Sequence, residues 1–359
     1  MNYLTLLVVL TINQLSVAVL VKQYNCDKYI LAWCQLHNVT VLQDQDLKSV
    51  QFPEVPQLGF INGTIVHFSH ALNLNLFKSG VLRIFARGTK ISRLTLPNTI
   101  EQLYFRDNDL QAVDIEPKVS YAIKFLRIHV NKLRDITNFQ HLKGLVELNL
   151  CDNLIEHLSF DTFASMVQLK QLLLCGNRLK TLTATHDIKL PNLYHLDLSG
   201  NFLFNQTSLN RWYFPRLGNF SLRDNLLTTL DVRIIAQRFP VLQILDVEHN
   251  SLNCETYQQL LKHVHQRRII FNVDKRMCQE LPAPVIPRSV PPSSGNELEE
   301  NGGGDWRTLV RQLKERLYQQ VKIINGQRTE IEQLKANLTT LMEQFDLVVA
   351  EPAKANDPF

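Results

Sequence analysis

Leucine and other apolar residues recur with a fixed spacing over most of the chain. The segments 145–155, 169–179 and 193–203 share the order Leu-x-x-Leu-x-Leu-x-x-Asn-x-Leu, with Ile155 in the last position of the first. Two degenerate copies come earlier, with Thr64 and Thr89 in the asparagine position. The asparagine itself recurs in steps of 22 to 25 residues, at Asn108, Asn131, Asn153, Asn177, Asn201, Asn225 and Asn250. The pattern therefore contains about nine repeats.

This order is the leucine-rich-repeat pattern and predicts an α/β solenoid over residues 56–252. Each repeat gives one short strand and a return segment, and its leucines cannot be buried until neighbouring repeats stack. The strands then run parallel on the concave face. The asparagine lies where the chain leaves the strand, so it can bind backbone groups that would otherwise be buried and unpaired.

Side chains alternate along a strand, so the variable positions of each repeat predict which residues line the concave face. Its N-terminal half is rich in arginine and aromatic residues, which dominate protein interfaces, and its C-terminal end carries acids. One hypothesis is a docking patch for an acidic protein surface; the alternative is a solvated face whose arginines pair locally or stack on Tyr104 and Phe125. The candidate partner-binding residues are Arg83, Phe85, Arg87, Tyr104, Arg106, Phe125, Arg127 and His129.

Both ends of a solenoid need a cap, and four of the six cysteines stand at those ends. Cys26 and Cys34 suit a disulfide in an N-terminal cap over residues 19–55. Cys254 and Cys278 suit one in a C-terminal cap over residues 253–281, which contains a helical segment at 257–264 and a strand at 268–273. Free buried thiols are the alternative for each pair.

The remaining cysteines, Cys151 and Cys175, occupy the same strand position in adjacent repeats, 24 residues apart. Their Cα atoms should lie about 4.8 Å apart, which permits an exposed, reducible disulfide; two free thiols are the alternative. His129 occupies the same strand position in the preceding repeat. A zinc site or a Cys–His nucleophile is disfavoured, because such a row does not converge and has no fourth ligand or orienting carboxylate. No catalytic residue, metal site or cofactor is expected, and the chain is not expected to be an enzyme.

The first 21 residues carry no charge and are mostly apolar, and Ser16, Val17 and Ala18 predict a signal peptide over 1–18. An uncleaved anchor is the alternative. No later segment is apolar enough for a membrane span, and a net charge of +4 is too small to indicate nucleic acid. The even number of cysteines and the glycosylation sequons fit a secreted, extracellular protein. The sequons are Asn38, Asn62, Asn205, Asn219 and Asn337; Asn62 and Asn219 are expected on the concave face.

The composition changes at a Pro- and Gly-rich linker, residues 282–304, which precedes a predicted helix over 305–350 and a tail over 351–359. Apolar residues in alternating steps of four and three predict a coiled-coil seam. Gln320 and Gln327 are polar seam positions of the kind that set partner or register. A helix folded back on its own solenoid is the alternative. The seam comprises Val310, Leu313, Leu317, Gln320, Ile324, Gln327, Ile331, Leu334, Leu338, Leu341 and Phe345.

This order of signal peptide, capped repeats and coiled coil resembles the mosquito leucine-rich-repeat immune proteins, particularly their short subfamily. The resemblance runs from residue 1 to about residue 348. It implies secretion into haemolymph, dimerisation through the coiled coil and binding of complement-like thioester proteins. The family often has an adjacent Cys-Cys pair before the coiled coil, whereas here only Cys278 precedes the linker. The alternatives are a direct recognition receptor for microbial surface ligands and an extracellular matrix or developmental protein.

Overall fold

The computed structural model describes residues 4–12, 15–30, 32–204, 208–267 and 269–272. The described residues belong to one compact unit, Met1–Ala283. The predicted linker, coiled-coil seam and tail lie outside the described residues, as do Cys278, Asn205 and Asn337.

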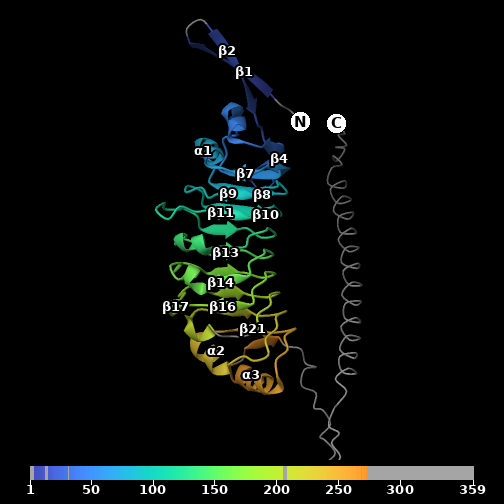
Figure 1. Ribbon diagram of the computed structural model, residues 1–359, viewed down its shortest axis with the longest axis vertical. Coiled ribbons are helices and arrows are strands. Elements are labelled where there is room, and N and C mark those ends of the chain that lie inside the picture. The colour runs from blue at the N-terminus through green and yellow to red at the C-terminus, as the bar shows by residue number, and fades with distance from the viewer. Residues whose placement is uncertain (1–3, 13–14, 31, 205–207, 268, 273–359) are drawn as a thin grey trace, which may run out of the picture. The chain divides into compact units, whose positions relative to one another are not determined.

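Twelve strands form one long sheet in which every neighbouring pair is parallel except β3 and β4. The coils stack in chain order from β4 towards α3 (Figure 1). In chain order the strands are β3 (Lys28–Ile30), β4 (Trp33–Val41), β6 (Gln57–Ile65), β8 (Arg83–Arg87), β10 (Gln102–Arg106), β12 (Phe125–Arg127), β13 (Glu147–Asn149), β15 (Gln171–Leu173), β18 (His195–Asp197), β20 (Asn219–Ser221), β21 (Ile244–Asp246) and β22 (Ile270–Asn272).

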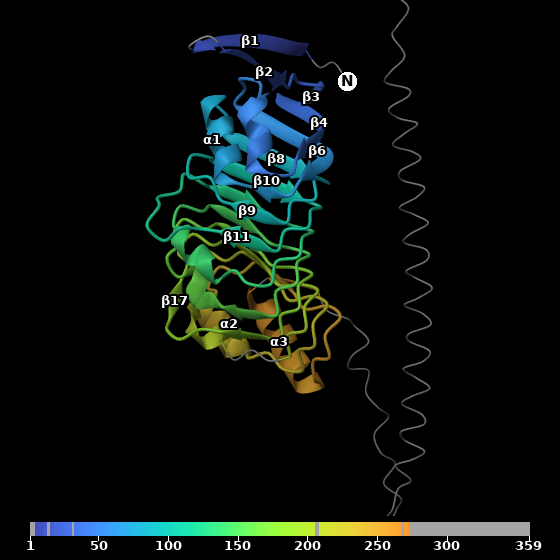
Figure 2. The same cartoon turned by 45° about the horizontal axis from the view of Figure 1, so that its top comes forward.

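The return segments contain shorter strands, single helical turns and two α-helices, which lie on the other side of the stack, whereas a third α-helix lies at its C-terminal end (Figure 2). Their strands make three small sheets: β7 (His67–Phe68), β9 (Arg93–Thr95) and β11 (Ala112–Asp114); β14 (His157–Ser159) and β16 (Thr181–Thr183); β17 (Ile188–Lys189) and β19 (Trp212–Tyr213). The helical turns are η1 (Asp44–Ser49), η2 (Thr137–His141), η3 (Phe160–Phe163) and η4 (Leu209–Arg211); the α-helices are α1 (His70–Lys78), α2 (Val232–Arg238) and α3 (Cys254–Arg267).

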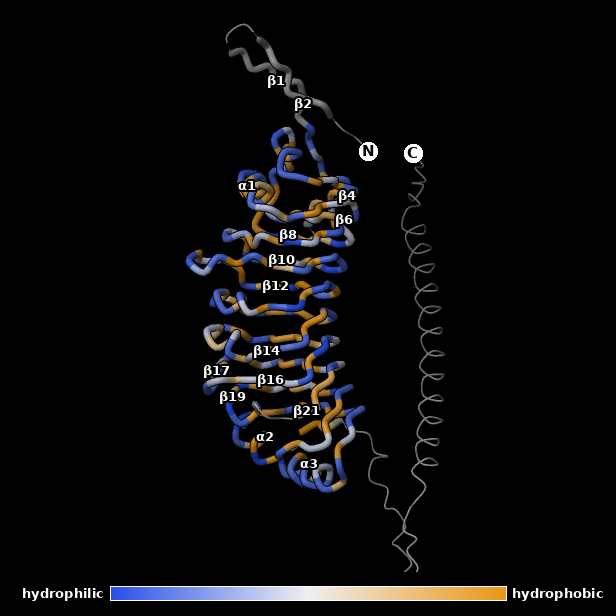
Figure 3. Tube along the Cα trace, viewed as in Figure 1, coloured by the Kyte–Doolittle hydropathy of each residue, from blue (hydrophilic) through white to orange (hydrophobic). Residues whose placement is uncertain are grey.

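Alternation along the strands buries one face of the long sheet and leaves the other open. In β8, Ile84 and Ala86 are fully buried, while Arg83, Phe85 and Arg87 point the other way. The same alternation continues in the later strands, and apolar residues follow the inner side of each coil (Figure 3). We call the side with the non-buried alternate residues the open face; it is the face that the repeat pattern predicts to be concave.

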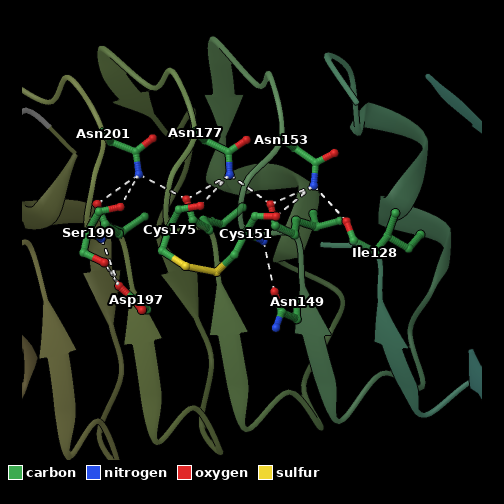
Figure 4. Close-up of a disulfide and its surroundings, with 12 residues drawn as sticks. Ile128, Asn149, Cys151, Asn153, Cys175, Asn177, Asp197, Ser199 and Asn201 are labelled. Atoms are coloured by element: carbon green, nitrogen blue, oxygen red, sulfur yellow. Dashed lines mark hydrogen bonds between the residues drawn. A yellow bond between two sulfur atoms is a disulfide. The ribbon is translucent and has the colours of Figure 1, made fainter. Parts of the chain in front are cut away.

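The repeat asparagines form a buried hydrogen-bonded ladder between coils. Asn177, which is 3% exposed, accepts a hydrogen bond from the N–H of Ile155 at 3.1 Å. Its Nδ2 donates to the carbonyls of Leu150 at 2.9 Å and Leu174 at 3.0 Å. Asn153 and Asn201 make equivalent bonds (Figure 4). The predicted role of the asparagine is therefore confirmed, because it pairs backbone groups that water cannot reach.

The residue before each ladder asparagine adopts a left-handed backbone conformation. Glycine fills this position at Gly176 and Gly200, where a positive φ costs little. Asp107, Asp152, Asp224 and His249 fill it in other coils. Val130 differs from these residues because it is β-branched. Its φ of 56° lies in a region that is unfavourable for such a side chain.

The caps extend the long sheet beyond the repeats. Cys26 and Cys34 are joined by a disulfide with a Cα–Cα distance of 5.2 Å. The strand that carries Cys34, β4, pairs in parallel with β6, so the N-terminal cap supplies a full member of the sheet. At the other end, the predicted helix is longer than expected, since α3 begins at Cys254, and β22 closes the sheet against β21. Cys254 is disulfide-bonded.

The N-terminal segment forms an antiparallel hairpin of β1 (Leu4–Ile12) and β2 (Leu15–Gln23), and β2 then pairs with β5 (Val50–Gln51). Cleavage after Ala18, which stays a prediction, would divide β2. Within the described part of the chain, no helix is both long enough and apolar enough to cross a membrane.

Candidate functional site

The open face is built from rows of side chains in strict register. Gln102 of β10 lies opposite Arg83, Tyr104 opposite Phe85 and Arg106 opposite Arg87. In β12, Phe125 lies opposite Gln102 and Arg127 opposite Tyr104. These residues are half-buried or exposed. The structure thus brings the predicted partner-binding residues together on one side of the sheet.

Three aromatic rings meet at the N-terminal end of this face. The ring of Trp33, in β4, contacts Phe85 and Tyr104, with centroid distances of 6.4 Å and 6.2 Å. Gly59 lies between these strands and has no side chain; a Cβ built there would come 3.4 Å from the Phe85 ring. The gap lets the Trp33 ring extend over β6. We call Trp33, Phe85 and Tyr104 the aromatic shelf.

Sequence reasoning missed Trp33, because residues 19–55 were assigned to a cap and not to the sheet. A signal was present: Cys34 and Leu36 alternate with Trp33 and Gln35, which is the alternation of a strand with one buried face.

Arg127 is held by groups of the protein itself. Its Nε lies 2.5 Å from Oε1 of Glu147 and its Nη2 lies 2.9 Å from Oε2, a bidentate pair. The guanidinium carbon also lies 4.9 Å from the centre of the Tyr104 ring. Hydrogen bonding to Glu147 raises the pKa of Arg127, and burial raises the pKa of Tyr104. For Arg127 the structure therefore matches the alternative, in which the arginine pairs locally and stacks on Tyr104.

Arg83, Arg87 and Arg106 differ from Arg127. Among the residues that the structure describes, no carboxylate oxygen lies within 4.0 Å of their guanidinium nitrogens. Arg87 and Arg106 are exposed, and Arg83 is half-buried. The N-terminal end of the open face therefore presents three positive charges, unmatched by an ion pair, beside the aromatic shelf.

The acids at the C-terminal end of the open face are partly paired with one arginine. Arg223 forms ion pairs with Glu248 and with Asp224, whose carboxylate lies 3.2 Å from its Nε. Asp197 accepts a hydrogen bond from the Ser199 hydroxyl at 2.6 Å. The predicted acidic character of this end is thus reduced by local pairing.

Cys151 and Cys175 are joined by a disulfide between adjacent strands, with a Cα–Cα distance of 4.5 Å (Figure 4). The expectation of an exposed bond is wrong for Cys151, which is only 6% exposed, whereas Cys175 is half-buried. Since each sulfur is bonded to the other, neither is a thiolate for a metal or a nucleophile. Within the described ranges, no cluster of three metal-binding side chains occurs.

His129 lies beside the Cys151 row with its Nδ1 buried and without a hydrogen-bond partner. Burial, with the nearby charge of Arg106, lowers the pKa of His129. The ring is therefore neutral at ordinary pH and adds no charge to the face.

The sequons occupy different environments. Asn38 and Asn62 are exposed, and both have a φ of 57°. Asn62 lies within β6, where its left-handed backbone interrupts the regular alternation of side chains, so its position on the concave face stays a prediction. Asn219 does lie on the open face, opposite His195.

A second depression, of about 390 Å³, lies between α1 and the loops after β9 and β11. Leu74, Phe77 and Tyr121 supply apolar surface there. Its polar groups are mostly used within the chain: Asp114 pairs with Arg93, and the Tyr121 hydroxyl accepts from the N–H of Glu116. The open face, with its unpaired arginines, is the stronger candidate for binding.

Comparisons with known proteins identify the repeat. Residues 124–179 and 143–203 match the leucine-rich repeat family. No curated protein matches the chain by sequence. Solved structures that resemble it include the leucine-rich repeat domain of the mosquito protein APL1B, at 21% identity and a TM-score of 0.45, which covers 66% of this chain and 62% of that one.

The mosquito LRIM1/APL1C complex matches at 20% identity and a TM-score of 0.48, over 87% of this chain and 53% of that one. This chain thus spans less than two thirds of either of these two structures. InlJ of Listeria monocytogenes, whose functional domain includes a cysteine ladder, matches at 18% identity and a TM-score of 0.48, over 70% of this chain and 55% of that one.

Proposed function

We propose that this leucine-rich-repeat protein is a secreted immune adaptor that binds an acidic protein surface through the N-terminal end of its open face. The observation that carries the proposal is the group of unpaired arginines, Arg83, Arg87 and Arg106, beside the aromatic shelf. Tryptophan, tyrosine and arginine are the residue types that contribute most to binding energy at protein interfaces. Unpaired charges on such a face also accelerate encounter with an oppositely charged partner.

The proposal also includes secretion of the protein and its assembly with a second chain. The uncharged N-terminal segment and the disulfides Cys26–Cys34 and Cys151–Cys175 support an extracellular protein. The seam predicted over residues 305–350 would recruit a second chain through a non-covalent coiled coil. The order of these parts supports an immune role like that of the haemolymph adaptors, including a complement-like thioester protein as one candidate partner.

The test compares proteins retained from extracellular fluid by the immobilised wild-type protein, by R87E/R106E and by R233E. Arg233 is a suitable control because its side chain is 88% exposed and belongs to α2, away from the long sheet. We expect the wild type and R233E to retain acidic proteins that added salt releases, and R87E/R106E to lose them. Equal retention by all three would contradict docking at this patch.

A further inference from the structure

Arg87 and Arg106 form an in-register pair of like charges on adjacent parallel strands. Neighbouring strands lie about 4.8 Å apart, so the two side chains leave the sheet side by side. Like charges placed directly opposite each other destabilise a sheet. The residues before them, Ala86 and Phe105, are fully buried and so fix which face of the sheet each side chain points to. Neither arginine can therefore turn to the other face without exposing the core.

Two other open-face arginines are paired with carboxylates, whereas in the described part of the chain this pair and Arg83 are not. Arg127 has Glu147, and Arg223 has Glu248 and Asp224. In the described part of the chain, Arg87 and Arg106 have no carboxylate within ion-pairing distance. The lowered pKa of His129, to which the charge of Arg106 contributes after burial, indicates that the positive field reaches the neighbouring strand.

The aromatic shelf adjoins this pair in a fixed geometry. Phe85 and Tyr104 stand two residues before Arg87 and Arg106 on the same face, which places the aromatic row about 6.6 Å from the arginine row. A para substituent on an aromatic ring that packs against the shelf and points along the strands would therefore reach the arginine row. Guanidinium groups bind tetrahedral oxyanions through paired hydrogen bonds.

We infer that Arg87, Arg106 and the aromatic shelf together bind an aryl oxyanion, a tyrosine in an acidic segment of the partner that carries a sulfate or phosphate ester. The ring packs on Trp33, Phe85 and Tyr104, while the ester oxygens accept hydrogen bonds from both arginines. This inference rests on the proposed docking role of the open face and names the group that the face recognises.

The probe is a short acidic peptide with one central tyrosine, supplied unmodified, O-sulfated and O-phosphorylated, and titrated against the full chain by fluorescence anisotropy. We expect one or both esters to bind about tenfold or more tightly than the unmodified peptide, from paired charge-assisted hydrogen bonds. The sulfated and phosphorylated arms show which ester the site prefers.

Four variants locate the site. R87A and R106A should each remove most of the preference for the ester. R87K should keep part of the affinity but lose much of the preference, because an ammonium group cannot donate the two parallel bonds of a guanidinium. R233A should bind like the wild type. Because Arg87 and Arg106 are exposed and repel each other, these changes should not lower the melting temperature, and its measurement excludes misfolding.

Equal affinity for the three peptides, or a preference that survives in both R87A and R106A, would overturn the inference. If the three peptides bind equally and R87E/R106E weakens all of them, docking of acidic partners stands while recognition of the ester fails. If no peptide binds, the inference is overturned, and the retention experiment alone decides the proposed function.

Discussion

At the scale of single residues, one position in the repeat carries backbone strain that can be removed. Val130 has a φ of 56°, where other coils use glycine, aspartate or histidine, and its side chain is 37% exposed. A left-handed conformation costs an ordinary residue about 1–2 kcal/mol, and asparagine tolerates it better than valine. We therefore expect Val130→Asn to raise the free energy of unfolding by about 1 kcal/mol, measured by chemical denaturation.

The matched control is Val167→Asn, which makes the same chemical change at a 47% exposed valine whose φ is not positive. That substitution should be neutral or slightly destabilising. A loss of stability on Val130→Asn equal to that on Val167→Asn would mean that Val130 is not strained.

A second residue-scale prediction separates structural from binding arginines. Arg127→Ala leaves the Glu147 carboxylate, 8% exposed, without its cation. Loss of a buried partner is costly, although the Arg127 side chain is itself 42% exposed, so we expect a loss of about 1–3 kcal/mol in unfolding free energy. Arg87→Ala should change stability by less than about 0.5 kcal/mol but reduce retention of acidic partners. The reverse pattern in denaturation and binding assays would contradict the assignment.

The repeat pattern could predict the position of these residues but not their pairing. Strand alternation placed Arg87, Arg106 and Arg127 on one face, and the register confirmed it. Which arginine is neutralised depends on side-chain geometry across strands, since Glu147 belongs to the next repeat. The left-handed residue before each asparagine was likewise not predicted, although Gly176 and Gly200 mark two of these positions.

At the scale of elements, the disulfide Cys151–Cys175 joins the ends of β13 and β15 and closes a loop of one repeat. Its sequence separation is 24 residues, and closing such a loop in the unfolded chain corresponds to about 3 kcal/mol of stabilisation. We expect C151A/C175A to lower the free energy of unfolding by roughly that amount. The retention of acidic partners should not change, because the aromatic shelf lies on earlier strands. An unaltered denaturation midpoint would contradict the prediction.

At the same scale, the element that supplies Trp33 to the site, β4, is predicted from the sequence only as part of a cap. The consensus asparagine is absent from the N-terminal cap, so β4 carried no repeat signature, and Trp33 was not assigned to the face. The later strands, which keep the consensus leucines, were predicted correctly because burial of those leucines leaves one register. Degenerate repeats thus lose the sequence signal while keeping the same backbone pairing.

At the scale of the whole molecule, the remaining prediction concerns assembly through residues 305–350. A lone helix with the proposed seam would expose a long apolar stripe, which favours a partner helix. We expect light scattering to give a dimeric mass for the secreted protein and a monomeric mass after deletion of residues 305–359. The double variant I331D/L338D provides a control of full length, because two buried charges in the seam should dissociate the dimer without removing the segment.

A monomeric mass for all three proteins would contradict self-assembly and favour either a different partner chain or a helix that folds back on its own repeats.

A dimer would also change how the open face binds its partner. Two copies would present two aromatic shelves on one particle, so a partner with repeated acidic segments would bind with an avidity above that of a single site. R87E/R106E should then abolish binding without changing the mass, whereas I331D/L338D should halve the mass and weaken, but not abolish, binding. An adaptor whose recognition and assembly segments are independent must give these two different results, one that changes binding alone and one that changes the mass.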